Sequence, residues 1–178
     1  MQELNAGILF SAAGGDSKAF KAVYEHYSPF LWKVIFRTVN GDIHAAEEIL
    51  QNVFVKVHAA IKGFRQQAAV STWMYRIAYT ESIAWLDNRA KQQRKLIPLS
   101  ALEHSALRSD AYDFRDLVSR ILATLSGEER FLLVAREIND VSFEELALVT
   151  DKSSGALRVM LHRIKEKIKE GFSDEYRI

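Results

Sequence analysis

Apolar residues recur at intervals of three and four along almost the whole chain of 178 residues, which contains only two prolines. This spacing places apolar side chains on one face of an α-helix, whereas a half-buried strand would need strict alternation. We find no segment with a convincing strand pattern. The periodicity therefore predicts an all-α fold, with turns at the few glycines and prolines.

The clearest helix is expected over residues 42–62, and Gly63 ends it. Its apolar stripe consists of Ile43, Ala46, Ile49, Leu50, Val53, Phe54, Val57 and Ile61. The remaining face is polar, except that Val55 lies near its centre. A solvated face is the simplest interpretation, and a protein-binding surface is the alternative, because apolar residues amid polar ones are common at interfaces.

Four further helical segments are expected before residue 96. A short amphipathic segment at residues 4–12 stops at Gly14, and Asp16 caps the next helix. Ser28 and Pro29 predict the start of a separate helix, because serine favours the N-cap and proline the first helical position. The fourth segment runs from about residue 71 into the basic run at residues 89–95.

The periodicity weakens at residues 96–112, which contain Pro98 and several serines. We interpret this stretch as a flexible linker between two small helical domains, residues 1–95 and 113–178, each with a core of its own. Four helices are expected beyond the linker. The second of them is expected to bury Ile138.

Serine residues mark the starts of three of these helices. Ser126 and Ser142 are each followed three residues later by glutamate, which is the capping-box pattern. Either Ser153 or Ser154 can cap the last helix.

Residues 141–169 have the outline of a helix-turn-helix, with a short capped helix, a tight turn and a longer basic helix. Six basic residues and one acidic residue lie between Lys152 and Lys169, a local balance of +5 in a chain of net charge +1. Cations on such a helix neutralise phosphates, and side chains near its N-terminus read base edges. The pattern predicts DNA binding, with a solvated helix in an ordinary bundle as the alternative. The candidate contacts are Lys152, Ser154, Gly155, Ala156, Arg158, Val159, His162, Arg163 and Lys165.

A second group combines aromatic with basic side chains, as binding sites for single-stranded nucleic acid do. Its members are Phe64, Trp73, Tyr75, Tyr79, Trp85, Arg89, Lys91, Arg94 and Lys95. The alternative is that these aromatic residues form a core, since aromatic residues at helical spacing usually do.

Several classes of function are disfavoured by the composition. The chain has no cysteine, and its five histidines show no metal-ligand spacing. Adjacent carboxylates such as Glu47 and Glu48 point in different directions on a helix, and there is no phosphate-binding glycine loop. We expect no enzymatic activity, no cofactor and no metal.

The lack of cysteine also favours a reducing compartment. No apolar run approaches the roughly 20 residues that cross a bilayer, and the N-terminus lacks the basic start of a signal peptide. We therefore expect a cytoplasmic protein.

In this order, the segments resemble the extracytoplasmic-function (ECF) group of bacterial RNA polymerase sigma factors, over nearly the whole chain. Residues 15–20 (GDSKAF) resemble the opening pattern of that group, and residues 46–57 (AEEILQNVFVKV) its polymerase-binding helix. Residues 73–78 (WMYRIA) resemble the start of its promoter-melting segment. Three further stretches resemble the promoter-binding domain of that group, namely residues 125–130 (LSGEER), 141–147 (VSFEELA) and 153–163 (SSGALRVMLHR).

The resemblance implies an alternative sigma factor, whose partners are core RNA polymerase, promoter DNA and, by analogy, an anti-sigma factor. The second domain would bind the minus-thirty-five element, and the first would bind polymerase and melt the minus-ten element. The implied polymerase contacts are Glu47, Glu48, Gln51, Asn52, Val55 and Lys56. The implied contacts to the downstream element are Phe64, Trp73, Tyr75, Arg76, Tyr79, Arg89, Lys91, Arg94 and Lys95.

The chain departs from the family pattern at several positions. In the melting segment, Tyr79, Thr80 and Ala84 stand where Arg, Asn and Asp are common. This depletion favours the alternative of a sigma-like DNA-binding regulator that no longer supports promoter opening. In the last helix Val159 replaces a typical Ser and is expected to point outward, toward a thymine methyl group or a protein surface.

Overall fold

The computed structural model describes residues 3–64, 69–96 and 114–172, with the backbone alone at residues 93–96 and 114–116. These ranges contain helices and no strand, as the periodicity predicted. The elements are α1 (Ala6–Ala13), α2 (Ser17–Thr38), α3 (Ile43–Ala60), the 3₁₀ helix η1 (Ile61–Gly63), α4 (Val70–Leu96), α5 (Phe114–Ala123), α6 (Gly127–Glu137), α7 (Phe143–Thr150) and α8 (Ser154–Gly171). Residues 97–112 of the expected linker lie outside the described residues.

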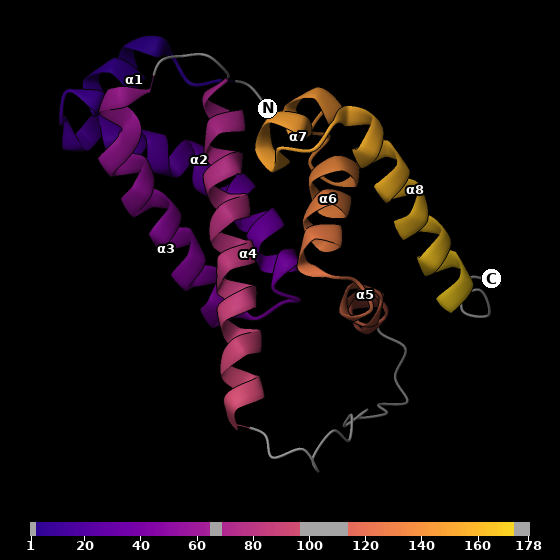
Figure 1. Cartoon of the computed structure of the whole chain (residues 1–178). Helices are drawn as coiled ribbons and strands as arrows, with labels where there is room; N and C mark the ends of the chain where they lie inside the picture. The colour runs from indigo at the N-terminus through magenta and orange to yellow at the C-terminus, as the bar shows by residue number, and fades with distance from the viewer. Residues whose placement is uncertain (1–2, 65–68, 97–113, 173–178) are drawn as a thin grey trace.

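Helices α2, α3 and α4 form the N-terminal half, with α1 packed on α2 (Figure 1). The side chain of Asp16 accepts hydrogen bonds from the backbone N–H groups of Lys18 and Ala19 and so caps α2. Asp42 caps α3 in the same way, through the N–H group of Ala45. Both caps satisfy donors that a helix start would otherwise leave unpaired.

The break expected at Pro29 is wrong, because α2 continues from Ser17 to Thr38 with the proline inside it. Proline removes one backbone hydrogen bond and crowds the preceding turn. The helix continues because one buried stripe spans the proline: Val23 and Tyr27 lie before it and Leu31 and Val34 after it, all essentially inaccessible to solvent. Tertiary packing therefore outweighs the local signal at this position.

Capping also explains the helices of the C-terminal half. Both predicted capping boxes are present, at Ser126 with Glu129 and at Ser142 with Glu145, and Ser153 is the residue that caps α8. The turn between α7 and α8 passes through Asp151, whose φ of 57° is left-handed. Aspartate tolerates this conformation better than most residues do.

The expectation of two separate cores is wrong. Buried apolar side chains of both halves form one continuous cluster, because α6 packs on α2 and α4, and α7 packs on α4 (Figure 1). Phe131 of α6 is fully buried, and its ring lies 5.0 Å from that of Tyr79 and 6.1 Å from that of Tyr75, both on α4. Helix α4 therefore packs against helices of both halves.

Candidate nucleic-acid and protein interfaces

The basic helix α8 presents its predicted DNA-contacting side chains to solvent. Leu157, Leu161 and Ile164 are buried against the rest of the C-terminal half. The candidates on the opposite face are exposed, namely Gly155, Ala156, Arg158, Val159, His162, Arg163 and Lys165. The outward orientation expected for Val159 is confirmed, since 52% of that residue is accessible to solvent.

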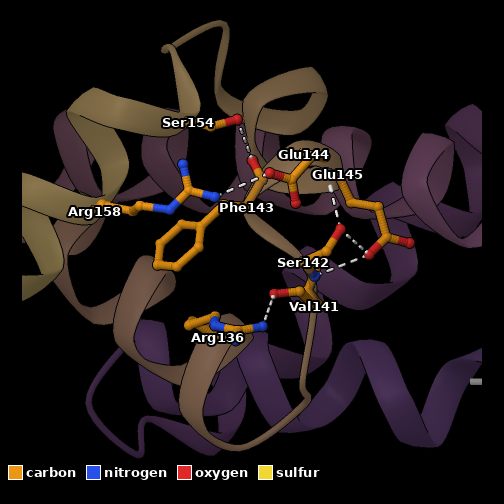
Figure 2. A network of polar contacts seen from close by, with 8 residues as sticks. All are labelled: Arg136, Val141, Ser142, Phe143, Glu144, Glu145, Ser154 and Arg158. Carbon is orange, nitrogen blue, oxygen red and sulfur yellow. Dashed lines mark hydrogen bonds and ion pairs between the residues drawn. The ribbon is translucent and has the colours of Figure 1, made fainter.

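A polar network links α8 to α7 (Figure 2). The guanidinium of Arg158 lies 4.8 Å from the ring centre of Phe143 and donates a hydrogen bond of 3.0 Å to Glu144. Arg136 lies over the same ring at 5.0 Å, so Phe143 lies between two cations. The hydroxyl group of Ser154 donates to the carbonyl of Phe143 at 3.2 Å. Arg158 and Ser154 therefore have a structural role in the helix-turn-helix in addition to the one predicted for them.

Two further predicted DNA contacts form ion pairs at the surface. Lys152 pairs with Glu128 at 3.3 Å, and Lys165 pairs with Glu137 at 3.0 Å. All four side chains are substantially exposed, and such pairs contribute little stability. Phosphate groups can therefore replace the carboxylates at small cost.

The aromatic and basic residues predicted for the downstream element fall into three places rather than one. Phe64, after η1, and Trp73, early in α4, pack with ring centres 4.9 Å apart, and both are half-buried. This pair is the part of the group most like a platform for an unpaired base. Arg89 lies sixteen residues further along α4, which at 1.5 Å per residue is about 24 Å away.

At that distant end, Arg89 is engaged within the molecule. Its guanidinium lies 4.9 Å from the ring centre of Trp85 and donates to Asp42 at 2.6 Å, which holds the pKa of that carboxyl below its usual value. Trp85 in turn donates its indole N–H to Glu48 at 3.1 Å. Lys91 is exposed, and the side chains of Arg94 and Lys95 lie outside the part of the chain that is described.

The remaining three downstream candidates face the C-terminal half of the same molecule. Tyr75 is 1% exposed, and its hydroxyl oxygen accepts a hydrogen bond of 2.6 Å from the amide of Asn139. Tyr79 donates to Glu128 at 3.1 Å. Burial raises the pKa of both phenols, so they stay neutral.

Arg76 completes this contact between α4 and the helix-turn-helix. One of its nitrogens donates to the carbonyl of Leu148 at 2.8 Å, and another to Asp151 at 2.7 Å. Leu148 belongs to α7 and Asp151 to the turn before α8. In this arrangement, the polar groups of Tyr75, Tyr79 and Arg76 already form hydrogen bonds within the molecule. They could contact DNA only after giving up these partners.

The polar face predicted to bind a protein lies on the solvent-exposed side of α3, where Glu48 and Lys56 also bond to Trp85 and Glu81 of α4. Its six candidates are all exposed: Glu47, Glu48, Gln51, Asn52, Val55 and Lys56. Val55 is 62% exposed, as its place on the helical wheel predicted. The expectation that Ile43 belongs to the buried stripe is wrong, because that residue is 54% exposed at the first position of α3.

Sequence reasoning missed Arg130 of α6, a half-buried cation that joins the two halves. Its Nε donates to the carbonyl of Leu122 at 2.6 Å and its Nη1 to the carbonyl of Thr38 at 3.2 Å. These carbonyls lie at the C-terminal ends of α5 and α2, where helix dipoles favour a positive charge. Burial alone lowers the pKa of this guanidinium. The sequence feature that could have indicated its role is the position of Arg130 directly before the apolar residues Phe131 and Leu132 in a capped helix.

The described part of the chain offers neither a metal site nor a membrane span. No group of three or more metal-ligating side chains occurs among those residues. None of the helices in the described ranges is both long and apolar enough to span a bilayer.

Two family models match the chain in the order in which its halves occur. Residues 23–94 match Sigma-70 region 2, and residues 115–168 match Sigma-70, region 4. The ECF RNA polymerase sigma-E factor of Escherichia coli (strain K12) is 26% identical over 169 residues, covering 86% of each chain. The ECF RNA polymerase sigma factor SigW of Bacillus subtilis (strain 168) is 24% identical over 173 residues, covering 90% of this chain and 92% of the relative.

Solved structures show the same fold. CnrH, in its complex with the cytosolic domain of CnrY, superposes with a TM-score of 0.70 at 18% identity and covers 94% of this chain and 96% of its own. The sigma factor RpoE of Bartonella quintana, bound to the anti-sigma factor NepR, gives a TM-score of 0.68 at 18% identity, with coverages of 86% and 96%. Both regions of the family match in the order in which the family has them, and the relatives match over most of their length. The chain therefore belongs to the ECF group of RNA polymerase sigma factors.

Proposed function

We propose that this chain is an alternative sigma factor, which binds core RNA polymerase and directs promoter-specific initiation of transcription. The observation that carries the proposal is the pairing of a region 2 match at residues 23–94 with a region 4 match at residues 115–168, the latter containing a solvent-facing basic recognition helix. Sigma factors are initiation factors and not enzymes, so the polymerase supplies the catalysis.

The two halves divide the work. Residues 113–178 hold the minus-thirty-five element through the exposed face of α8, where Arg163 and His162 lie toward solvent. Residues 1–95 bind the polymerase through the outer face of α3, centred on Val55, whose exposure supports this role. Lysine and arginine on α8 provide most of the affinity through phosphates, and the N-terminal residues of the helix read bases.

Promoter melting belongs to the N-terminal half. An unpaired base of the minus-ten element stacks on the Phe64 and Trp73 pair, and this capture offsets the few kcal/mol that unstacking costs. Tyr79, Thr80 and Ala84 give the segment fewer charged groups than the family pattern has. If these changes abolish melting, the chain is instead a sigma-like regulator that binds DNA without opening it.

Regulation by a partner is part of the proposal. The similar structures of CnrH and of Bartonella RpoE were determined as complexes, the second with an anti-sigma factor. By analogy with them, we expect a protein of this kind to sequester the chain. We place the chain in the cytoplasm, where polymerase and chromosome are found.

Run-off transcription with core polymerase and genomic promoter fragments tests the function. We expect transcripts that depend on the added chain. Core binding without transcripts from any promoter would favour the regulator, and no binding to core would overturn the assignment as a sigma factor.

The orientation of α8 is tested by Arg163→Ala, which is expected to weaken binding of the upstream element about ten-fold, since an arginine contact to DNA is typically worth 1–3 kcal/mol. Lys169→Ala removes the same charge from the last turn of α8 and is the matched control, expected to have a smaller effect. Equal effects of the two variants would contradict this orientation.

A further inference from the structure

We infer that α8 reads the upstream element through an apolar surface, and that this chain selects a thymine methyl group at the base pair that faces Val159. The inference rests on the proposed function and names the kind of base pair that the recognition helix accepts. It assigns base selectivity to Val159, with Ala156 beside it, and leaves affinity to the cations of the helix.

Val159 lies at the centre of the exposed face of α8. At about 100° per residue, the buried residues Leu157, Leu161 and Ile164 share a sector of roughly 60°, and Val159 points almost directly away from its middle. The exposure of 52% agrees with this direction. Arg163 follows one turn later on the same face and is also exposed. The part of α8 that points most directly away from the protein core is therefore an isopropyl group in the first half of the helix.

The polar side chains at the N-terminal end of α8 already have partners within the protein. Ser153 caps the helix with its hydroxyl oxygen. Ser154 donates its hydroxyl proton to the carbonyl of Phe143 at 3.2 Å (Figure 2). Arg158 donates to Glu144 at 3.0 Å and lies over the ring of Phe143, so its guanidinium is directed toward α7. The groups that most often read base edges are thus engaged at this end of the helix.

The surface that remains at the N-terminal end of α8 is apolar. Gly155, Ala156 and Val159 are exposed, and none of them has a side-chain donor or acceptor. In the major groove the thymine methyl is the apolar group on the base edges, where the other groups are donors and acceptors. An apolar side chain packed against one of those polar groups would leave it without a partner, at a cost in free energy. This surface therefore favours a thymine methyl.

The charges around Val159 favour DNA over a protein as its partner. From Lys152 to Lys169 the chain has six basic residues and one acidic residue, and Arg158 and Arg163 are exposed on either side of Val159. The centres of protein interfaces are depleted of charged residues. A groove bordered by phosphates instead accommodates an apolar group that cations surround.

Modified bases test the inference with holoenzyme assembled from core polymerase and the full-length chain. Selection from DNA with a randomised upstream element identifies the bound sequence, in which we expect thymine at one position or more. Deoxyuridine then replaces each thymidine in turn, which removes the methyl group alone. At the position that faces Val159 we expect about four-fold weaker binding, corresponding to the free energy of burying one methyl-sized group. At the same position, 5-methylcytosine should bind more tightly than cytosine.

Val159→Ala removes the proposed contact. Holoenzyme with this variant should bind thymidine and deoxyuridine DNA with nearly equal affinity, because the shorter side chain no longer reaches the methyl group. The variant should fold, since the position is exposed and alanine favours helices. Leu148→Ala is the matched control, because it also shortens an exposed aliphatic side chain, on α7 and 54% exposed. It should keep the full response to deoxyuridine.

The outcomes separate this inference from the proposed function. A selected upstream element without thymine, or equal binding of thymidine and deoxyuridine at every position, would overturn the inference. A Val159→Ala chain that keeps the full response to deoxyuridine would also overturn it, and weaker binding of that chain to core polymerase would place Val159 against protein. Holoenzyme that selects no DNA sequence at all would instead overturn the proposed function.

Discussion

At the scale of single residues, the helical wheel places side chains correctly in the middle of the helices and is wrong at two positions at helix ends. Val55 and Val159, both well inside their helices, are exposed as predicted. Ile43 and Ile138 were expected to be buried and are 54% and 48% exposed. Ile43 is the first residue of α3 and Ile138 the C-cap of α6, where the neighbouring helices no longer cover the stripe.

Val55→Asp tests the protein-binding face at this scale. We expect the variant to bind core polymerase at least ten-fold more weakly, because a charge would replace an apolar contact at the centre of an interface. Its helicity and unfolding temperature should stay close to those of the wild type, since Val55 is 62% exposed. Titration of core polymerase and circular dichroism measure the two effects.

Val57→Asp is the contrasting control, because Val57 is fully buried two residues away on the same helix. That variant should fail to fold, since it would bury an unpaired charge. A Val55→Asp chain that unfolds like the control would place Val55 in the core in solution.

At the scale of elements, the helix starts and stops could largely be predicted, because caps are local chemistry. The capping boxes at Ser126 and Ser142 depend on residues three positions apart and are present as expected. The prediction failed at Pro29, where the deciding interaction is the burial of a stripe against other helices. Such packing is a property of the tertiary structure that a local pattern does not contain.

Pro29→Ala is therefore expected to stabilise the protein. Pro29 is exposed, so its removal costs little packing, and alanine restores the backbone N–H that the interior of α2 lacks at this position. We expect the free energy of unfolding to rise by about 1–3 kcal/mol. Urea denaturation measures the change. Lys33→Ala, at another exposed site in α2, should alter stability by less than about 0.5 kcal/mol, and a destabilised Pro29→Ala would show that the proline is needed for the shape of α2.

At the scale of the whole molecule, the sequence predicts each half but not their contact. The aromatic and basic residues of α4 indicate a nucleic-acid site, and the structure turns three of them, Tyr75, Arg76 and Tyr79, toward the C-terminal half. Tyr75 meets Asn139, which lies 64 positions away in the chain, and Arg76 meets Asp151 across 75 positions. Nothing in the spacing of either segment encodes a partner at that distance.

Alkaline titration gives a prediction for the molecule as a whole. Burial raises the pKa of Tyr27 to about 12, and it raises the pKa of Tyr75 and Tyr79, which lie between α4 and the C-terminal half. An unfolded tyrosine loses its proton near pH 10, whereas these three keep theirs, so deprotonation favours the unfolded chain. We expect the free energy of unfolding to fall as pH rises from 10 to about 12. Tyr27→Phe should reduce that slope in urea titrations, and an unchanged slope would contradict the assignment.

The face of α4 that carries Tyr75, Arg76 and Tyr79 contacts α6 and α7, and the proposed function assigns it a contact with promoter DNA as well. Under that assignment, a substitution there that alters promoter preference also alters the packing of α4 on α6 and α7. The exposed N-terminal positions of α8, at Gly155, Ala156 and Val159, carry no such double constraint. New promoter preferences are therefore expected to arise mainly through changes in α8, which also makes these positions the safer choice for engineering orthogonal regulators.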